Sequence, residues 1–196
     1  QGAAELWDPI TGEITPLNVE RQSEYASIEL DMPKAGSCFV VFNHNKKQQK
    51  VEKVELANTQ SIDNKWTVQF PEGWGAPAEL EIETLAPWCE WPMSKEGQAF
   101  SGTATYTTTF NWSNESKEVV LDLGKVSMIA EVFVNDQKVR TLWCTPYAAD
   151  ITSYVKQGEN KLQVKVTSTW FNRLAFDASL PEAERKTWTI EGPKAD

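Results

Sequence analysis

The residues best suited to bind a ligand stand together near the end of the chain, in residues 168–177 (STWFNRLAFD). Sugar rings stack their apolar C–H faces on aromatic planes, and amide, guanidinium and carboxylate groups hydrogen-bond their hydroxyls. A Trp-Phe pair followed by Asn172, Arg173 and Asp177 suits a carbohydrate, but it also suits a structural corner. We favour the corner, with the Arg173 guanidinium bound to loop carbonyls or to Asp177. The strand expected before it ends at Trp170 and leaves these polar residues in a loop.

Tryptophan is the second signal for carbohydrate binding, since the chain has nine in 196 residues. Aromatic side chains also dominate β-sheet cores, where each buries roughly 150 to 250 Å². Trp66, Trp143 and Trp170 alternate in step with inward aliphatic neighbours, so we expect them in the core. In irregular segments a surface or interdomain role competes evenly with the core. The tryptophans in such segments are Trp74, Trp88 and Trp91.

Both signals together define a set of candidate carbohydrate-binding residues. The set combines aromatic rings that can stack on a sugar with the polar groups of residues 168–177. Its members are Trp88, Trp91, Trp143, Tyr147, Asn172, Arg173 and Asp177.

Catalysis by the chain itself finds little support. Glycoside hydrolysis usually needs two carboxylates roughly 5 to 9.5 Å apart, one of them with a raised pKa. Here Glu79, Glu81 and Glu83 alternate along the solvent face of an expected strand, and Glu182 and Glu184 lie in a polar tail. The sequence also lacks the GxSxG, GxxxxGK and GxGxxG motifs of triad hydrolases and nucleotide-binding proteins. We therefore expect no catalytic residue.

Metal ions and cofactors are not supported by a motif. The single histidine, His44, lies in a polar, turn-like segment, where a solvated loop residue is expected. Oxygen ligands for calcium exist at Asp122, Asp136, Asp150 and Asp177, but their spacing matches no EF-hand. We expect no cofactor, and a calcium site stays open.

Three cysteines, Cys38, Cys89 and Cys144, occur without a CxxC spacing. One disulfide stays open, but three separate thiols are the simpler interpretation, because a free cysteine behaves as a small hydrophobe.

Charge and hydropathy exclude two classes of partner. A net charge of -9 and a pI near 4.8 oppose nucleic-acid binding, which needs clustered Lys and Arg. No apolar run approaches the roughly 20 residues that span a bilayer, and no basic-then-apolar leader opens the sequence. We expect neither a nucleic-acid nor a membrane partner. The start at Gln1 without an initiator Met suggests a processed chain or an excised piece.

Alternation with period two dominates the sequence and predicts an all-β chain without an amphipathic helix. The first 62 residues are expected to form a small antiparallel β module. Its expected elements are two short strands around a Pro/Gly turn over 6–14, a half-buried strand over 25–32, a strand covered on both faces over 38–42 and a further strand over 50–56.

Residues 63–192 are expected to form a larger domain, with 193–196 as a tail. Threonines alternate with larger residues over 103–110, and Asn135 with Asp136 suggests a hairpin because both tolerate left-handed backbone. A turn over 158–160 leads into a further alternating strand. Many short strands separated by turns indicate a β-sandwich or jelly roll.

Several stretches of the chain resemble glycoside hydrolases. Those over 100–106 (FSGTATY), 121–126 (LDLGKV), 130–135 (AEVFVN), 150–152 (DIT) and 158–160 (GEN) resemble the sugar-binding jelly roll of family 2. The fuller pattern resembles the carboxy-terminal region of family 106, the α-L-rhamnosidase type, through 5–13 (ELWDPITGE), 39–42 (FVVF), 74–77 (WGAP), 142–147 (LWCTPY), 169–174 (TWFNRL) and 180–181 (LP).

This resemblance covers nearly the whole chain. It implies a galactose-binding-like jelly-roll β-sandwich over about 63–192, preceded by a β module that connects it to a catalytic barrel. That barrel, with acidic catalytic residues and bound calcium, would precede residue 1. Relatives tend to carry Asn-Gly where this chain has Asn135 and Asp136, and a glycine near Arg140, which leaves the turn type open. By resemblance we expect a protein secreted, periplasmic or on the surface of a bacterium.

The expected function is therefore that of non-catalytic β domains in a glycoside hydrolase of the α-L-rhamnosidase type. The expected partners are the catalytic barrel of the same polypeptide and a plant-type polysaccharide or oligosaccharide. Three alternatives stay open: a free-standing carbohydrate-binding module, a purely structural interdomain scaffold, and a complete small glycosidase.

Overall fold

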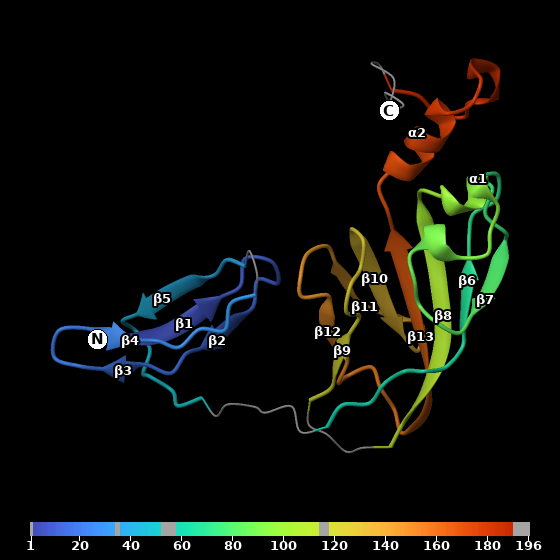
Figure 1. Cartoon of the computed structure of the whole chain (residues 1–196). Coiled ribbons are helices and arrows are strands. Elements are labelled where there is room, and N and C mark those ends of the chain that lie inside the picture. Colours follow the sequence, from blue (N-terminus) through green and yellow to red (C-terminus); the bar gives the residue numbers. More distant parts are fainter. Residues whose placement is uncertain (1, 34–35, 52–57, 114–117, 190–196) are drawn as a thin grey trace. The chain divides into compact units, whose positions relative to one another are not determined.

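The computed structural model describes residues 2–33, 36–51, 58–113 and 118–189. The chain divides into two compact units, Gln1–Gln60 and Ser61–Asp196. Figure 1 draws the first in blue and cyan and the second from green to red. Every described sheet lies within one unit, so each unit has its own β structure.

The first unit is a small antiparallel β module. Its main sheet has the strand order β2-β1-β5, and β1 pairs with both neighbours. Asp8 closes the β1–β2 turn, because its Oδ1 accepts hydrogen bonds from the backbone amides of Ile10 (2.7 Å) and Thr11 (3.2 Å). Gly12 takes the left-handed backbone that the turn requires (φ 73°), so the predicted strand pair around a Pro/Gly turn is confirmed. The strands are β1 (Ala3–Trp7), β2 (Ile14–Pro16), β3 (Glu20–Arg21), β4 (Ala26–Ser27) and β5 (Phe39–Asn43).

The prediction of a half-buried strand over 25–32 is wrong. Only Ala26–Ser27 of this segment is strand, and Tyr25, Leu30 and Met32 are exposed. An alternating sequence buries one face only where a second layer of structure covers it.

The prediction of a strand covered on both faces over 38–42 is half right. β5 forms there, but Phe39 and Phe42 are exposed. Again no second layer covers the sheet among the described residues of this unit, whose buried hydrophobic residues are Ala3 and Ala4. Most of the candidate strand over 50–56 lies outside the described residues.

The second unit is built on a six-stranded antiparallel sheet with the order β11-β10-β13-β8-β6-β7. Its two ten-residue strands, β8 and β13, pair along their whole length from Thr103↔Thr167 to Trp112↔Gly158. A separate pair, β9 and β12, makes a second small sheet. This confirms the all-β fold. The strands are β6 (Trp66–Gln69), β7 (Glu79–Ile82), β8 (Thr103–Trp112), β9 (Val120–Asp122), β10 (Ile129–Val134), β11 (Gln137–Leu142), β12 (Ala148–Asp150) and β13 (Gly158–Thr167).

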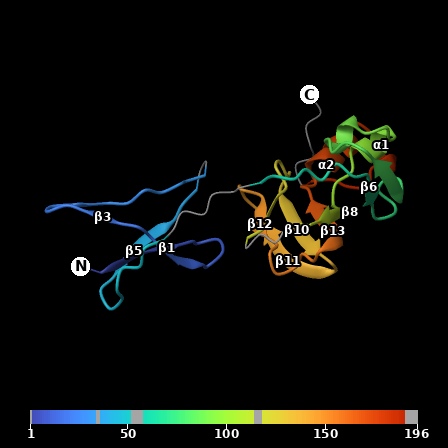
Figure 2. The same ribbon diagram turned by 90° about the horizontal axis from the view of Figure 1, so that it is seen from below.

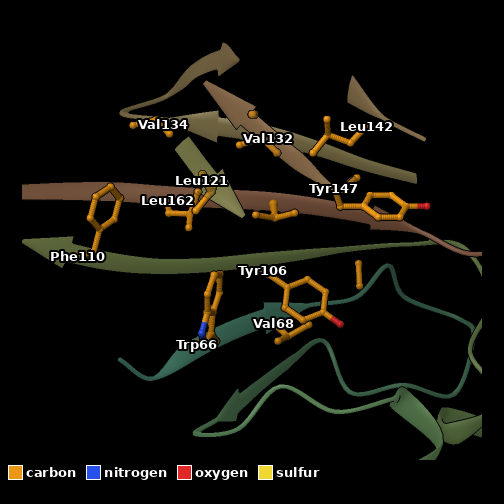
Figure 3. Packing of buried hydrophobic residues seen from close by; sticks show 14 of the residues in the cluster. Trp66, Val68, Tyr106, Phe110, Leu121, Val132, Val134, Leu142, Tyr147 and Leu162 are labelled. Carbon is orange, nitrogen blue, oxygen red and sulfur yellow. The ribbon is translucent and has the colours of Figure 1, made fainter. Parts of the chain in front are cut away.

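The core of the second unit is formed by the inward residues of these strands. Alternate residues of β8, β10 and β13 are buried, as period-two alternation predicts. Leu121 of β9 and Ala149 of β12 belong to the same buried cluster, so the small sheet covers one face of the large one. Figure 3 shows 14 residues of this cluster as sticks, among them Trp66, which is buried as predicted.

The predicted hairpin at Asn135 and Asp136 joins β10 to β11. Both residues have positive φ (50° and 64°), as the favoured two-residue hairpin turns require. The side-chain amide of Asn135 also donates, through Nδ2, to Asn160 Oδ1 and to the Tyr154 carbonyl, both at 2.8 Å. Asn160 is fully buried and donates in turn to the carbonyls of Lys156 and Gly158. The hairpin is thus tied to the turn that precedes β13.

The described residues also contain four short helical segments, which the sequence did not predict. A periodicity of 3.6 residues is detectable only over windows of about 11 to 18 residues, and these segments are shorter. No helix within the described residues is long and apolar enough to cross a membrane. The segments are η1 (Trp88–Glu90), α1 (Lys95–Gln98), α2 (Phe171–Ala178) and η2 (Glu182–Glu184).

We expect Leu162→Ala to lower the free energy of unfolding by about 2 to 5 kcal/mol, because it leaves a cavity at a buried position in β13. An exposed position of the same strand offers a matched control, and Glu159→Ala should change stability by less than about 0.5 kcal/mol. Urea denaturation followed by tryptophan fluorescence measures both. Equal effects of the two substitutions would contradict the assigned strand register.

Candidate functional site

Arg173 is the centre of the polar cluster that the sequence singled out. Its side chain is fully buried in α2. Nη2 donates to Asp177 Oδ1 at 2.6 Å, one helical turn further on, and Nη1 donates to Glu96 Oε1 at 2.8 Å. Glu96 belongs to α1, and both views show α1 and α2 at the same end of the second unit (Figures 1 and 2). The guanidinium therefore joins two segments that lie 77 residues apart in sequence.

Two aromatic rings flank the guanidinium. Arg173 Cζ lies 5.5 Å from the ring centroid of Trp74 and 5.4 Å from that of Phe176, within the range of cation–π attraction. Trp170 meets Trp74 edge-on, with the ring centroids 5.0 Å apart. The rings exclude water from the charge, which strengthens its pairing with the carboxylates.

Asp177 uses its second oxygen to hold the segment that follows η2. Oδ2 accepts hydrogen bonds from the backbone amides of Lys186 (3.1 Å) and Thr187 (2.7 Å), and from the Thr187 hydroxyl (2.7 Å). Lys186 Nζ then donates to Glu96 Oε1 (2.9 Å) and to the Gly73 carbonyl (2.8 Å). One buried carboxylate thus fixes both the guanidinium and the chain that passes over it.

Close packing around Glu96 requires a glycine at position 75. Gly75 has a φ of 81°, and a Cβ there would lie 2.3 Å from the Glu96 Cγ. Ser94 begins α1 by accepting a hydrogen bond from the amide of Gly97 at 3.0 Å, which sets the direction of the helix that carries Glu96. The loop beside Trp74 can therefore approach α1 only without a side chain.

The two carboxyl groups stay ionised. Hydrogen bonds from Arg173 and Lys186 lower the pKa of Glu96 below its ordinary 4.5. Burial would raise the pKa of Asp177, but hydrogen bonds from Arg173 and Thr187 outweigh it and hold the pKa below 3.8. A glycosidase acid needs the opposite, a raised pKa near its working pH. These groups are suited to a structural ion network.

The corner hypothesis is confirmed in its main contact, the pairing of Arg173 with Asp177. The accompanying prediction that Asn172, Arg173 and Asp177 lie in a loop is wrong, because α2 runs from Phe171 to Ala178. The i, i+4 spacing of Arg173 and Asp177 on one helical face is what allows their pairing.

The candidate carbohydrate-binding residues fall into three separate groups. Trp88 begins η1, Trp91 directly follows it, and both pack in or against the core. Trp143 and Tyr147 lie between β11 and β12, and Asn172 with the Arg173–Asp177 pair belongs to α2. Trp91 and Tyr147 are buried, and the Tyr147 hydroxyl donates to the Met128 carbonyl at 2.8 Å. Trp143 and Asn172 present exposed side chains.

The expectation that Trp143 and Trp170 belong to the core is wrong. Their side chains are 58% and 45% exposed. β11 ends at Leu142 and β13 ends at Thr167, so both residues lie beyond the pleat whose alternation was extended to them. For Trp88 and Trp91, where a surface role and the core competed evenly, the structure places both against the core.

Comparison with known proteins identifies the second unit. Residues 94–194, just over half of the chain, match the family described as "Glycosyl hydrolase 2 galactose-binding domain-like". The chain belongs to this family. The matched region contains β8 to β13 and the Glu96, Arg173, Asp177 and Lys186 side chains of the ion network, so the network is part of the galactose-binding-like domain.

Two relatives place this domain in larger proteins. A protein of Formosa agariphila named "Putative beta-glucuronidase" is 43% identical over 135 residues, which are 66% of this chain and 11% of that protein. The structure of a rhamnosidase from Novosphingobium sp. PP1Y superposes on 98% of this chain with a TM-score of 0.82 and 32% identity. The match takes up 19% of the rhamnosidase. The chain thus spans only a small part of both proteins, and the predicted likeness to rhamnosidase-type glycoside hydrolases is confirmed.

Sequence reasoning missed three partners of Arg173 and Asp177 in the galactose-binding-like domain: Glu96, Lys186 and Thr187. The available signal was weak. A buried arginine between aromatic residues needs more than one acceptor, but no local pattern points from residue 173 to residue 96. The two glycines that flank Trp74 were a further hint of a tight loop against another element.

Other candidate groups stay apart in the described residues. Glu79, Glu81 and Glu83 are exposed on and beside β7, as expected. No three His, Cys, Asp or Glu side chains of the described ranges gather as a metal site would need. All three cysteines, Cys38, Cys89 and Cys144, are free thiols, as predicted.

We expect Asp177→Asn to lower the free energy of unfolding by about 3 to 5 kcal/mol at neutral pH, because it leaves the buried Arg173 charge without its closest partner. The folded-state pKa of Asp177 is depressed, so its contribution is complete above about pH 4 and is lost as the pH falls through the folded value. The difference in free energy of unfolding between the unaltered chain and Asp177→Asn should therefore narrow only in acid.

Urea denaturation of both proteins between about pH 3 and 8 measures this difference in free energy of unfolding. Glu184→Gln removes an exposed acid from the nearby η2 and is the matched control, with a change below about 0.5 kcal/mol expected. A difference that stays constant down to pH 3 would show that the ionised Asp177 carboxylate does not supply this stability.

Proposed function

We propose that this chain is a non-catalytic β region of a larger glycoside hydrolase of the α-L-rhamnosidase type, where it packs against the catalytic barrel. One observation carries the proposal: both units of the chain match one rhamnosidase, over 98% of this chain at a TM-score of 0.82. Because the match takes up 19% of the rhamnosidase, most of that protein lies outside it.

The electrostatics of the ion network support a structural role. Its two carboxyl groups have lowered pKa values and are bound by Arg173, Lys186 and Thr187. Retaining or inverting hydrolysis needs a carboxylic acid that is still protonated near neutral pH. The lowered pKa values of Glu96 and Asp177 do not suit that role, and we assign the hydrolytic pair to the barrel.

A second candidate differs in the substrate of the whole enzyme. The Formosa agariphila protein, with its β-glucuronidase name, has the higher identity, 43% over 135 residues. This favours a β-glucuronidase as the larger protein. Both candidates assign the same non-catalytic role to this chain. For either one we propose an enzyme outside the cytoplasm of a bacterium, where it would meet polysaccharide.

The test compares the complete polypeptide that the gene encodes with the 196-residue chain. We expect the complete polypeptide to hydrolyse an aryl α-L-rhamnoside and the chain alone to hydrolyse neither that substrate nor an aryl β-glucuronide. Activity of the complete polypeptide on the glucuronide alone would establish the second candidate. Hydrolysis of either compound by the chain alone, or a gene without a catalytic domain, would contradict both.

Carbohydrate contact is proposed for Trp143, whose exposed indole can stack on a sugar ring. We expect rhamnose-containing oligosaccharides to quench the tryptophan fluorescence of the chain, and Trp143→Ala to abolish the quenching while the melting temperature stays unchanged. Trp188→Ala removes another exposed indole and is the matched control. Quenching that survives in Trp143→Ala, or no quenching in the unaltered chain, would remove this residue from the proposal.

A further inference from the structure

The described residues of the first unit form no hydrophobic core of large side chains. The buried apolar cluster of the chain consists of residues from Trp66 to Val164, all in the second unit. In the described part of the first unit the only buried hydrophobic residues are Ala3 and Ala4, whose side chains are the smallest that can contribute. Its exposed large hydrophobic residues are Trp7, Ile10, Ile14, Tyr25, Leu30, Met32, Phe39 and Phe42.

Polar contacts hold the first unit together instead. Gln48 bridges two segments, because its Oε1 accepts from the Ala4 amide (3.1 Å) and its Nε2 donates to the Leu17 carbonyl (2.6 Å). Arg21 Nη2 donates to the Gly2 carbonyl at 2.5 Å. Each such bond contributes only about 0.5 to 1.5 kcal/mol net, and a module of this size without a core is marginal by itself.

Three of the exposed residues form a continuous apolar row across the sheet. Trp7 is paired directly with Ile14 of β2 on one side and with Phe39 of β5 on the other. Directly paired residues project from the same face of a sheet. The three side chains are 51% (Ile14), 40% (Trp7) and 61% (Phe39) exposed, so the row leaves a broad apolar stripe uncovered. We call it the Trp7 row.

Polar groups beside the Trp7 row are already paired within the unit. The indole Nε1 of Trp7 donates to Glu5 Oε2 at 3.3 Å, and Lys46 Nζ binds Glu5 Oε1 at 2.5 Å. Glu5 is buried and lies on the same face, two residues before Trp7 in β1. Sugars are recognised by converging hydrogen-bonding groups around an aromatic plane. The Trp7 row offers apolar surface without such groups, which suits an apolar protein surface.

We infer that the Trp7 row is the surface by which the first unit binds the catalytic domain of the larger polypeptide. The inference rests on the proposed function and specifies the contact. The matched rhamnosidase contains both units within one chain, and most of that chain lies outside the match. A covalently linked domain is present at high effective concentration, so even a three-residue apolar row can be kept covered.

The experiment is hydroxyl-radical footprinting of the complete polypeptide and of the 196-residue chain, read residue by residue by mass spectrometry. We expect Trp7 and Phe39 to be oxidised in the isolated chain and at least about fivefold more slowly in the complete polypeptide, as expected for side chains buried at an interface. Phe110, buried in the second unit, is the internal control and should be protected in both.

A charged substitution tests the contact independently. Phe39→Lys should leave the melting temperature of the isolated chain unchanged, because the side chain is exposed there. In the complete polypeptide it should make the junction between the β region and the rest of the protein at least about tenfold more sensitive to limited proteolysis. Ile10→Lys, at an exposed position in the β1–β2 turn outside the row, is the matched control and should change neither measurement.

The possible outcomes separate the inference from the proposed function. An active complete polypeptide in which Trp7 and Phe39 react as fast as in the isolated chain would overturn the inference alone. Protection that already exists in the isolated chain would overturn it too, and dependence on protein concentration would then identify a second copy as the occupant. A complete polypeptide without a catalytic domain would overturn the proposed function, and the inference with it.

Discussion

A buried guanidinium is the constraint around which one end of the galactose-binding-like domain is organised. Removing a charge from water costs several kcal/mol unless ionic partners and hydrogen bonds replace the solvent. Arg173 is fully buried and gains two carboxylates and two flanking rings. Each of these partners comes with its own structural requirement. The positions of α1, of the loop at Trp74 and of the segment after η2 all follow from the need to surround one cation.

Asp177 shows how this requirement spreads through the chain. A carboxylate that only neutralised Arg173 would need one oxygen, but the second oxygen accepts three hydrogen bonds from Lys186 and Thr187. Loss of the carboxylate would therefore release the final described segment as well as the guanidinium. Such coupling makes the cluster cooperative, since its members share acceptors and their energies do not add.

The parts of the fold that could be predicted from sequence are those where local pattern and tertiary burial agree. β8 and β13 alternate over their whole length and have a second layer to face, so both the strands and their inward residues follow from the pattern. The hairpin at Asn135 and Asp136 was predictable because left-handed backbone is a local property. Alternation fails at strand ends. Trp143 and Trp170 continue the alternation in the sequence, but both lie beyond the last residues of β11 and β13.

The candidate site was only partly predictable for a related reason. The Arg173–Asp177 pair lies within one helical turn and could be proposed from their proximity, whereas Glu96 approaches from 77 residues away.

The two units differ in how far their own structure covers their hydrophobic side chains. In the second unit the small sheet of β9 and β12 covers the alternating strands, and large side chains such as Phe100 and Leu162 are fully enclosed. In the described part of the first unit, Trp7, Ile14, Phe39 and Phe42 of the sheet are exposed. Hydrophobic stabilisation is proportional to the area that is removed from water, so a surface that covered these side chains would stabilise the unit. Attachment to a larger protein would supply such a covering surface. In the rhamnosidase the part that matches this chain belongs to a larger protein of that kind.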